Sequence, residues 1–152
     1  MRKKHRKTVQ LRYVRGIPKH VMKSLQLLVP AALKTVEIKH KIGILIVPHG
    51  TIQCQGDHSF GLFMHYPGGK LQIVVAAGMY RLIRRDGERH APAILDVLLT
   101  LLHELGHYEQ YRNGGLHRVT ERGIQVRTRI TLYRKFLEHL PSRLRRHYTF
   151  PL

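Results

Sequence analysis

Cysteine, tryptophan and acidic residues are scarce in this chain of 152 residues, which has one cysteine, no tryptophan and nine acidic residues. The single cysteine, Cys54, cannot form an intrachain disulfide, so nothing in the chain requires an oxidising compartment and we expect a cytoplasmic protein. No apolar run approaches the roughly 20 residues that a membrane span requires. With 43% hydrophobic residues the chain can form a core, which excludes a wholly disordered basic tail.

The shortage of acids leaves a large positive excess, because 27 lysines and arginines give a formal net charge of +18. This excess lies at the two ends. Residues 1–36 hold ten basic residues and no acid, residues 112–152 hold ten against two, and residues 37–111 are balanced at seven against seven. Basic ends around a neutral body indicate an anionic partner, with nucleic acid as the first candidate and an anionic membrane surface as the second. We expect non-specific contact with nucleic acid through these ends.

Apolar spacing and turn residues divide the chain into a basic arm at 1–16, one domain at 17–141 and a basic, aromatic tail at 142–152. They predict strands at Ile42–Val47, Phe60–His65 and Leu71–Ala76, of which the last two form an antiparallel hairpin, and helices at Ala93–Arg112 and from Thr120 to Pro141. The first of these helices is apolar almost all round and should be central. We therefore predict an α+β fold with a small, mostly antiparallel sheet packed on a central helix and a second helix following it.

The central helix contains the segment His103-Glu104-Leu105-Gly106-His107. Two histidines four residues apart lie one turn apart on the same helix face, where both imidazoles can bind one divalent ion. A glutamate beside the first histidine can face a water molecule on that ion. The spacing therefore predicts a metal site with His103 and His107 as ligands and Glu104 as a catalytic general base.

A catalytic zinc usually has three protein ligands, and two residues after the central helix are candidates for the third. If Gly114 is the centre of a turn between two antiparallel helices, His107 and Glu121 lie seven residues on either side of it, at similar height. His117 would lie about four residues, or ~6 Å, nearer the turn. Helix geometry thus favours Glu121, and His117 is the alternative.

The segment from His103 to Tyr133 resembles the active core of the zincin metallopeptidases, and the predicted order of elements is similar to that of minimal gluzincins. This resemblance implies a zincin-like fold, Zn²⁺ as cofactor, a peptide or protein substrate, and ligation by His103, His107 and Glu121. Gluzincins often have an acid four residues after the ligand glutamate that supports a histidine, whereas this chain has Gln125 there. SprT-like proteins share the start of the motif but take a histidine from the next loop, which would favour His117.

The resemblance implies metal-assisted hydrolysis of peptide bonds, in which Glu104 takes a proton from water and passes it to the leaving amine. An extended substrate would pair with an edge strand, either 60–65 or 71–76. Candidates for stabilising the oxyanion are Tyr108, Tyr111, His117 and Arg127. Two alternatives remain: a nucleic-acid-binding protein with a structural or vestigial metal site, and an SprT-like protease acting on proteins bound to nucleic acid.

Overall fold

The structure is a computed structural model that describes residues 8–152, so the first seven residues of the predicted basic arm lie outside the described part. The strands are β1 (Val9–Tyr13), β2 (Ile42–Val47), β3 (Ile52–Cys54), β4 (Asp57–Ser59), β5 (Gly61–His65) and β6 (Leu71–Ala76). The helices are α1 (Lys19–Leu33), α2 (Met79–Arg85), α3 (His90–Gly114), α4 (Ile124–Arg127), α5 (Tyr133–Glu138) and α6 (Ser142–Tyr148). A 3₁₀ turn, Leu116–Arg118, follows α3, and a π-helical segment, Thr128–Leu132, joins α4 to α5. This is the mixed α and β composition that the sequence predicts.

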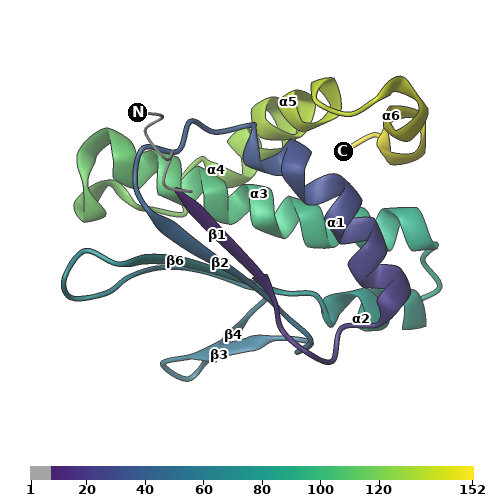
Figure 1. Ribbon diagram of the computed structural model, residues 1–152, viewed down its shortest axis with the longest axis horizontal. Coiled ribbons are helices and arrows are strands. Elements are labelled where there is room, and N and C mark those ends of the chain that lie inside the picture. The colour runs from purple at the N-terminus through teal and green to yellow at the C-terminus, as the bar shows by residue number, and fades with distance from the viewer. Residues whose placement is uncertain (1–7) are drawn as a thin grey trace, which may run out of the picture.

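Four strands form one sheet in the order β1-β2-β6-β5, and β3 and β4 form a separate hairpin (Figure 1). The predicted hairpin is confirmed, because β5 and β6 pair antiparallel from Gly61 opposite Val75 to His65 opposite Leu71. The prediction of a mostly antiparallel sheet is wrong, since β1 pairs with β2, and β2 with β6, in the parallel direction.

Both parallel pairs follow from crossover connections, which parallel neighbours require. Helix α1 carries the chain from the end of β1 back to the start of β2, and residues 48–70 carry it from β2 to β6. The central strands β2 and β6 are almost entirely apolar, as strands in parallel pairings usually are. Strands β1 and β5 are left as the two edges of the sheet.

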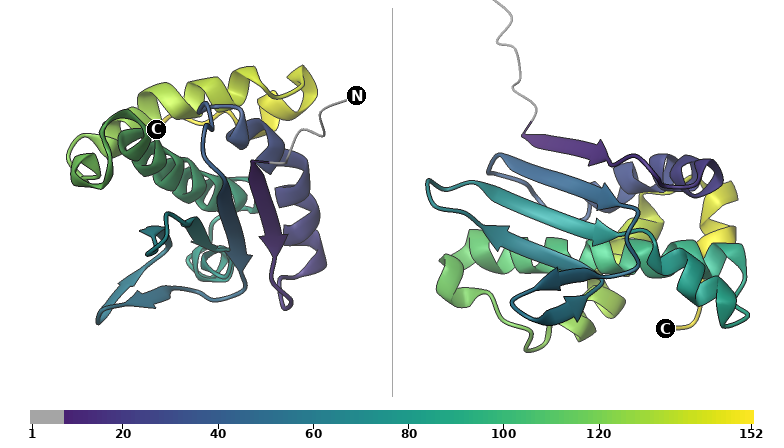
Figure 2. Two further views of the ribbon diagram at one scale, coloured as in Figure 1. Left: turned by 60° about the vertical axis from the view of Figure 1, so that its left-hand side comes forward. Right: turned by 90° about the horizontal axis from the view of Figure 1, so that it is seen from below.

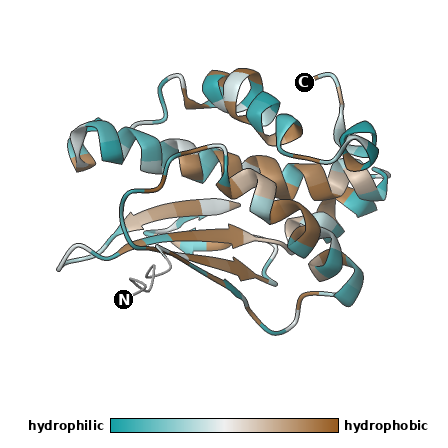
Figure 3. Ribbon diagram, turned by 45° about the horizontal axis from the view of Figure 1, so that its top comes forward, coloured by the Kyte–Doolittle hydropathy of each residue, from teal (hydrophilic) through white to brown (hydrophobic). Residues whose placement is uncertain are grey.

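Helix α3 is the centre of the core, as its apolar composition predicts. The sheet lies in front of α3 in the right-hand view of Figure 2, which looks at the molecule from below, and its strands are mostly brown in the hydropathy colouring of Figure 3. Leu98, Leu102 and Leu105 of α3 are completely buried.

Although α3 has 25 residues, no helix within residues 8–152 is both long and apolar enough to cross a membrane.

The C-terminal segment packs against the domain. Tyr148 at the end of α6 is buried, and its carbonyl oxygen accepts a hydrogen bond from the Tyr133 hydroxyl of α5. The same hydroxyl accepts a hydrogen bond from the backbone N–H of Phe150 at 3.0 Å. Arg145 of α6 donates to the carbonyl oxygens of Leu137, in α5, and Leu140, in the turn after it, at 2.9 and 3.1 Å, and so joins α6 to the end of α5.

Tyr108 connects α3 to the segment that enters β2. Its side chain is completely buried, and its hydroxyl accepts hydrogen bonds from the backbone N–H groups of Lys39 and His40 at 2.9 and 3.2 Å. The hydroxyl also lies 2.9 Å from Nδ1 of His40. One residue of the motif helix thus holds the loop before the central strand.

Replacing Tyr108 by Phe should lower the free energy of unfolding by about 1–3 kcal/mol, because two backbone N–H groups lose their acceptor. Urea denaturation measures this loss. Tyr111→Phe is the matched control, because no hydrogen bond among the described residues involves the Tyr111 hydroxyl, and it should have a much smaller effect. Equal losses in the two variants would contradict a specific role for the Tyr108 hydroxyl.

Candidate metal centre

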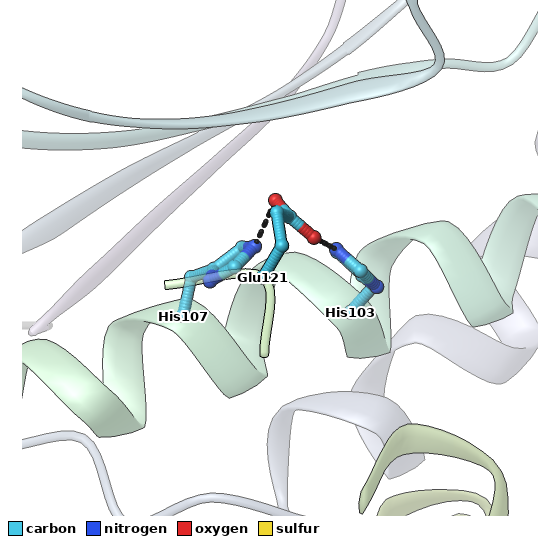
Figure 4. Close-up of side chains that lie close together, drawn as sticks. All are labelled: His103, His107 and Glu121. Carbon is cyan, nitrogen blue, oxygen red and sulfur yellow. Dashed lines mark hydrogen bonds and ion pairs between the residues drawn. The ribbon is translucent and has the colours of Figure 1, made fainter. Parts of the chain in front are cut away.

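His103 and His107 lie one turn apart on α3 and point toward the same carboxylate, that of Glu121 (Figure 4). Nε2 of His103 lies 3.0 Å from one carboxylate oxygen, and Nε2 of His107 lies 2.8 Å from the other. The ligand atoms of the three residues are all within 4.8 Å of one another. The structure therefore brings together the three residues that the sequence predicts as ligands, in a group that could hold a metal ion.

The donor set of this group fits zinc. Two imidazole nitrogens and one carboxylate oxygen are a common protein ligand set for catalytic zinc, and they leave a fourth position for water. Both histidines are largely buried, with side-chain exposures of 19% and 6%, whereas the Glu121 side chain is 77% exposed. An ion held here would be anchored on the buried helix and reached from the side of Glu121.

Glu121 does not lie on the second helix, contrary to the prediction of a ligand-bearing helix starting near Thr120. Helix α4 begins only at Ile124, because Gly123 adopts a φ of 76°, outside the helical region. Glu121 therefore belongs to the turn that enters the helix, three residues before its start. His117, the alternative ligand, is exposed on the 3₁₀ turn and is not part of the group.

Two contacts pack α4 against α3. Gly106 allows close packing, since a Cβ atom there would lie 2.6 Å from the Cδ1 atom of Ile124. Arg127 of α4 donates through Nε to Oε1 of Glu109, a residue on α3. Both contacts lie within one turn of His107 along α3, and both join α3 to α4 rather than to the turn that carries Glu121.

Gln110 is a residue of the site that sequence reasoning missed. Its Oε1 atom lies 2.9 Å from Nδ1 of His107, the ring nitrogen that faces away from Glu121. Gln125, which stands where the resemblance to gluzincins would place an acid that supports a histidine, is exposed and makes no hydrogen bond to a described histidine. The spacing of three residues between His107 and Gln110 on a helix is the signal from which this contact could have been predicted.

Glu104 is buried beside the group, with 6% of its surface exposed. Burial raises the pKa of its carboxyl group from 4.5 to about 8, and the negative charge of Glu121 adds to the increase. Strand β5 covers it closely: a Cβ atom on Gly61 would lie 2.9 Å from Oε1 of Glu104 and 2.7 Å from Thr100. A carboxyl group in this setting is suited to exchange a proton with a bound molecule.

Burial also lowers the pKa of His103, and the neighbouring His107 lowers it further, whereas Glu121 opposes the change. A lowered pKa keeps more of the imidazole neutral at neutral pH, the form that can bind a metal.

Two cavities meet at the group. One of about 390 Å³ lies beside His103, and one of about 300 Å³ lies beside His107. The residues that line both are Ser59, Gly61, Glu104 and Glu121. Strand β5 is thus the edge strand next to the site, whereas β6, the other candidate edge, is enclosed between β2 and β5.

The four residues expected as candidates for oxyanion stabilisation line neither cavity. The Tyr108 hydroxyl is held by the loop before β2, and Arg127 is paired with Glu109. Tyr111 packs against the rings of His40, Phe63 and His65. Arg129 lines the larger cavity instead, at the surface.

Comparisons of the chain with protein-family models, with curated proteins and with solved structures found no match. The resemblance to zincins therefore stays a prediction from the motif residues, and the metal-binding group stands on its own geometry.

The raised pKa of Glu104 makes the metal-free protein sensitive to pH. The folded state binds the Glu104 proton more tightly than the unfolded state does. The protonated carboxyl group therefore contributes its full stabilisation of the folded state below pH 4.5, and this contribution is lost as the pH rises toward about 8. Glu104→Gln lacks this titration. Between about pH 5 and pH 7.5 the wild type should therefore lose about 3 kcal/mol of unfolding free energy relative to the variant.

Urea denaturation of chelator-treated protein at the two pH values measures this difference, and the comparison cancels the titration of all other groups. If the free energy of unfolding changed equally with pH in wild type and variant, burial would not raise the pKa of Glu104.

Proposed function

We propose that the protein is a zinc-dependent metallopeptidase with a zincin-like fold, in which His103, His107 and Glu121 bind the metal. The observation that carries this proposal is the convergence of two motif histidines and one distant carboxylate on a single point beside a buried glutamate. A purely structural site would not need a buried, high-pKa carboxyl group open to a cavity.

Bound zinc would activate a water molecule and polarise the scissile carbonyl group. Glu104 would accept the proton of that water and then donate it to the leaving amine, the two roles of a general base and acid. Burial by β5 and α3 keeps its carboxylate away from bulk water, so its proton exchanges with the reacting groups. Gly61, at the start of β5, leaves room for this carboxylate under the strand.

The substrate would be an extended peptide or protein segment that lies along the free edge of β5. This edge borders both cavities, so a backbone paired with it would cross the metal-binding group. Side chains on either side of the cleaved bond would enter the two cavities.

The gluzincin-like arrangement is favoured over the SprT-like one, because Glu121 rather than His117 joins the two motif histidines. The cytoplasmic location and non-specific contact of the basic ends with nucleic acid stay predictions from composition, and part of the N-terminal end lies outside the described residues.

Removing the proposed third ligand should remove the metal. Glu121→Ala should weaken Zn²⁺ binding by more than about 100-fold, beyond the loss expected for a residue that only supports a ligand. His117→Ala should bind as wild type does, at one ion per chain. Elemental analysis after dialysis against a weak chelator measures the metal content. Zinc retained by Glu121→Ala and lost by His117→Ala would contradict the proposed ligand set.

Glu104→Gln should keep the metal but lose hydrolysis by about 10²–10⁴-fold, the contribution typical of a positioned acid–base group. A library of unstructured peptides, with cleavage followed by mass spectrometry, provides the substrate. Asp96→Asn is the control, since Asp96 lines the larger cavity but is not part of the metal-binding group. Undiminished hydrolysis by Glu104→Gln would contradict the mechanism.

A further inference from the structure

Gln110 contacts two separate parts of the metal-binding group through one carboxamide. Its Oε1 atom lies 2.9 Å from Nδ1 of His107 and accepts a hydrogen bond from the backbone N–H of Thr120 at 3.1 Å. Its Nε2 atom donates to the carbonyl oxygen of Thr120 at 3.0 Å. Thr120 immediately precedes Glu121, so this one side chain touches a ligand histidine and the backbone beside the ligand carboxylate.

The backbone of Thr120 determines which way the amide of Gln110 points. A backbone N–H can only donate and a backbone carbonyl can only accept, so the amide oxygen must face the first and the amide nitrogen the second. The reversed orientation would lose both hydrogen bonds. The oxygen of Gln110 therefore also faces His107.

This orientation in turn determines the tautomer of His107. The amide oxygen of Gln110 can only accept, so Nδ1 of His107 must carry the proton that joins them. When Nδ1 holds the proton of a neutral imidazole, Nε2 has the free lone pair. Nε2 is the atom that faces Glu121, so the metal-binding nitrogen points toward the other two ligands.

Glu121 needs support of this kind because it lies outside a helix. Its side chain is 77% exposed, and its own turn is closed by a 3.3 Å hydrogen bond from the Ile124 N–H to the Glu121 carbonyl. The two hydrogen bonds to Thr120 fasten the preceding residue to α3. They hold the backbone of the turn at a constant distance from His107.

We propose that Gln110 is a positioning residue that sets both the tautomer of His107 and the place of Glu121, so that the ligand group is assembled before a metal arrives. The inference rests on the proposed function, because it assumes that this group binds zinc. Gln110 does not bind the metal itself. It acts on affinity through the two ligands that it orients.

The test compares Gln110→Ala with Gln110→Glu and with Glu109→Gln. The alanine variant loses all three contacts and should bind Zn²⁺ about 10–100-fold more weakly, the usual effect of removing a group that orients a ligand. The glutamate variant keeps an acceptor for His107 and for the Thr120 N–H but loses the donor to the Thr120 carbonyl. It should recover part of the affinity.

Glu109→Gln is the matched control, because Glu109 is the neighbouring residue on α3 and joins α4 through Arg127 without touching His107 or Thr120. It should lower the free energy of unfolding of the metal-free protein and leave the affinity unchanged. Competition with a chromogenic chelator measures Zn²⁺ affinity. The visible spectrum of the Co²⁺-substituted protein, which reports ligand geometry, should change in Gln110→Ala and not in Glu109→Gln.

Wild-type affinity and an unchanged Co²⁺ spectrum in Gln110→Ala would overturn this inference while leaving the metal site intact. If Glu109→Gln weakened Zn²⁺ binding as much as Gln110→Ala does, the inference would also be overturned, because the loss of affinity would then follow from a general loss of stability. If Gln110→Ala does not fold, Gln110→Glu decides by the same two measurements. Failure of the wild type to bind Zn²⁺ would instead overturn the proposed function.

Discussion

The burial of α3 is the constraint on which the rest of the structure depends. This helix is apolar on most of its surface, so the sheet, α1 and the C-terminal helices gather around it. Its polar residues His103, Glu104 and His107 line the two cavities beside β5. The same burial that forms the core thus removes Glu104 from water and raises its pKa, and lowers the pKa of His103.

The turn after α3 brings the exposed carboxylate of Glu121 to two largely buried histidines. A buried helix can present two histidines, but a third ligand must come from another segment and stay in place although it is exposed. A side chain of α3 itself provides this support, because Gln110 is hydrogen-bonded to the backbone of Thr120, the residue before Glu121. The segment that carries the Glu121 carboxylate is thereby fastened to the helix that carries the histidines.

Several of the few acidic residues of the chain lie close together in the structure. Three of the nine acids, Glu104, Glu109 and Glu121, lie at the metal-binding group or beside it. Glu121 contacts the two histidines, Glu109 is paired with Arg127, and Glu104 is buried. These three acids therefore offset little of the positive charge elsewhere on the chain. Basic residues nonetheless lie close to the candidate site, since Arg129 lines the larger cavity and Arg127 is paired with Glu109.

Local spacing by itself determined the strands β2, β5 and β6, the long helix α3, and the shared face of His103 and His107, because these depend on residues within a few positions of one another. Tertiary structure alone decided the parallel direction of the central strands, since direction depends on how connections cross the sheet. It also decided between Glu121 and His117. Gly123 delayed the start of α4 to Ile124, so Glu121 lies in the turn before that helix, and contacts with α3 bring its exposed carboxylate to the two histidines.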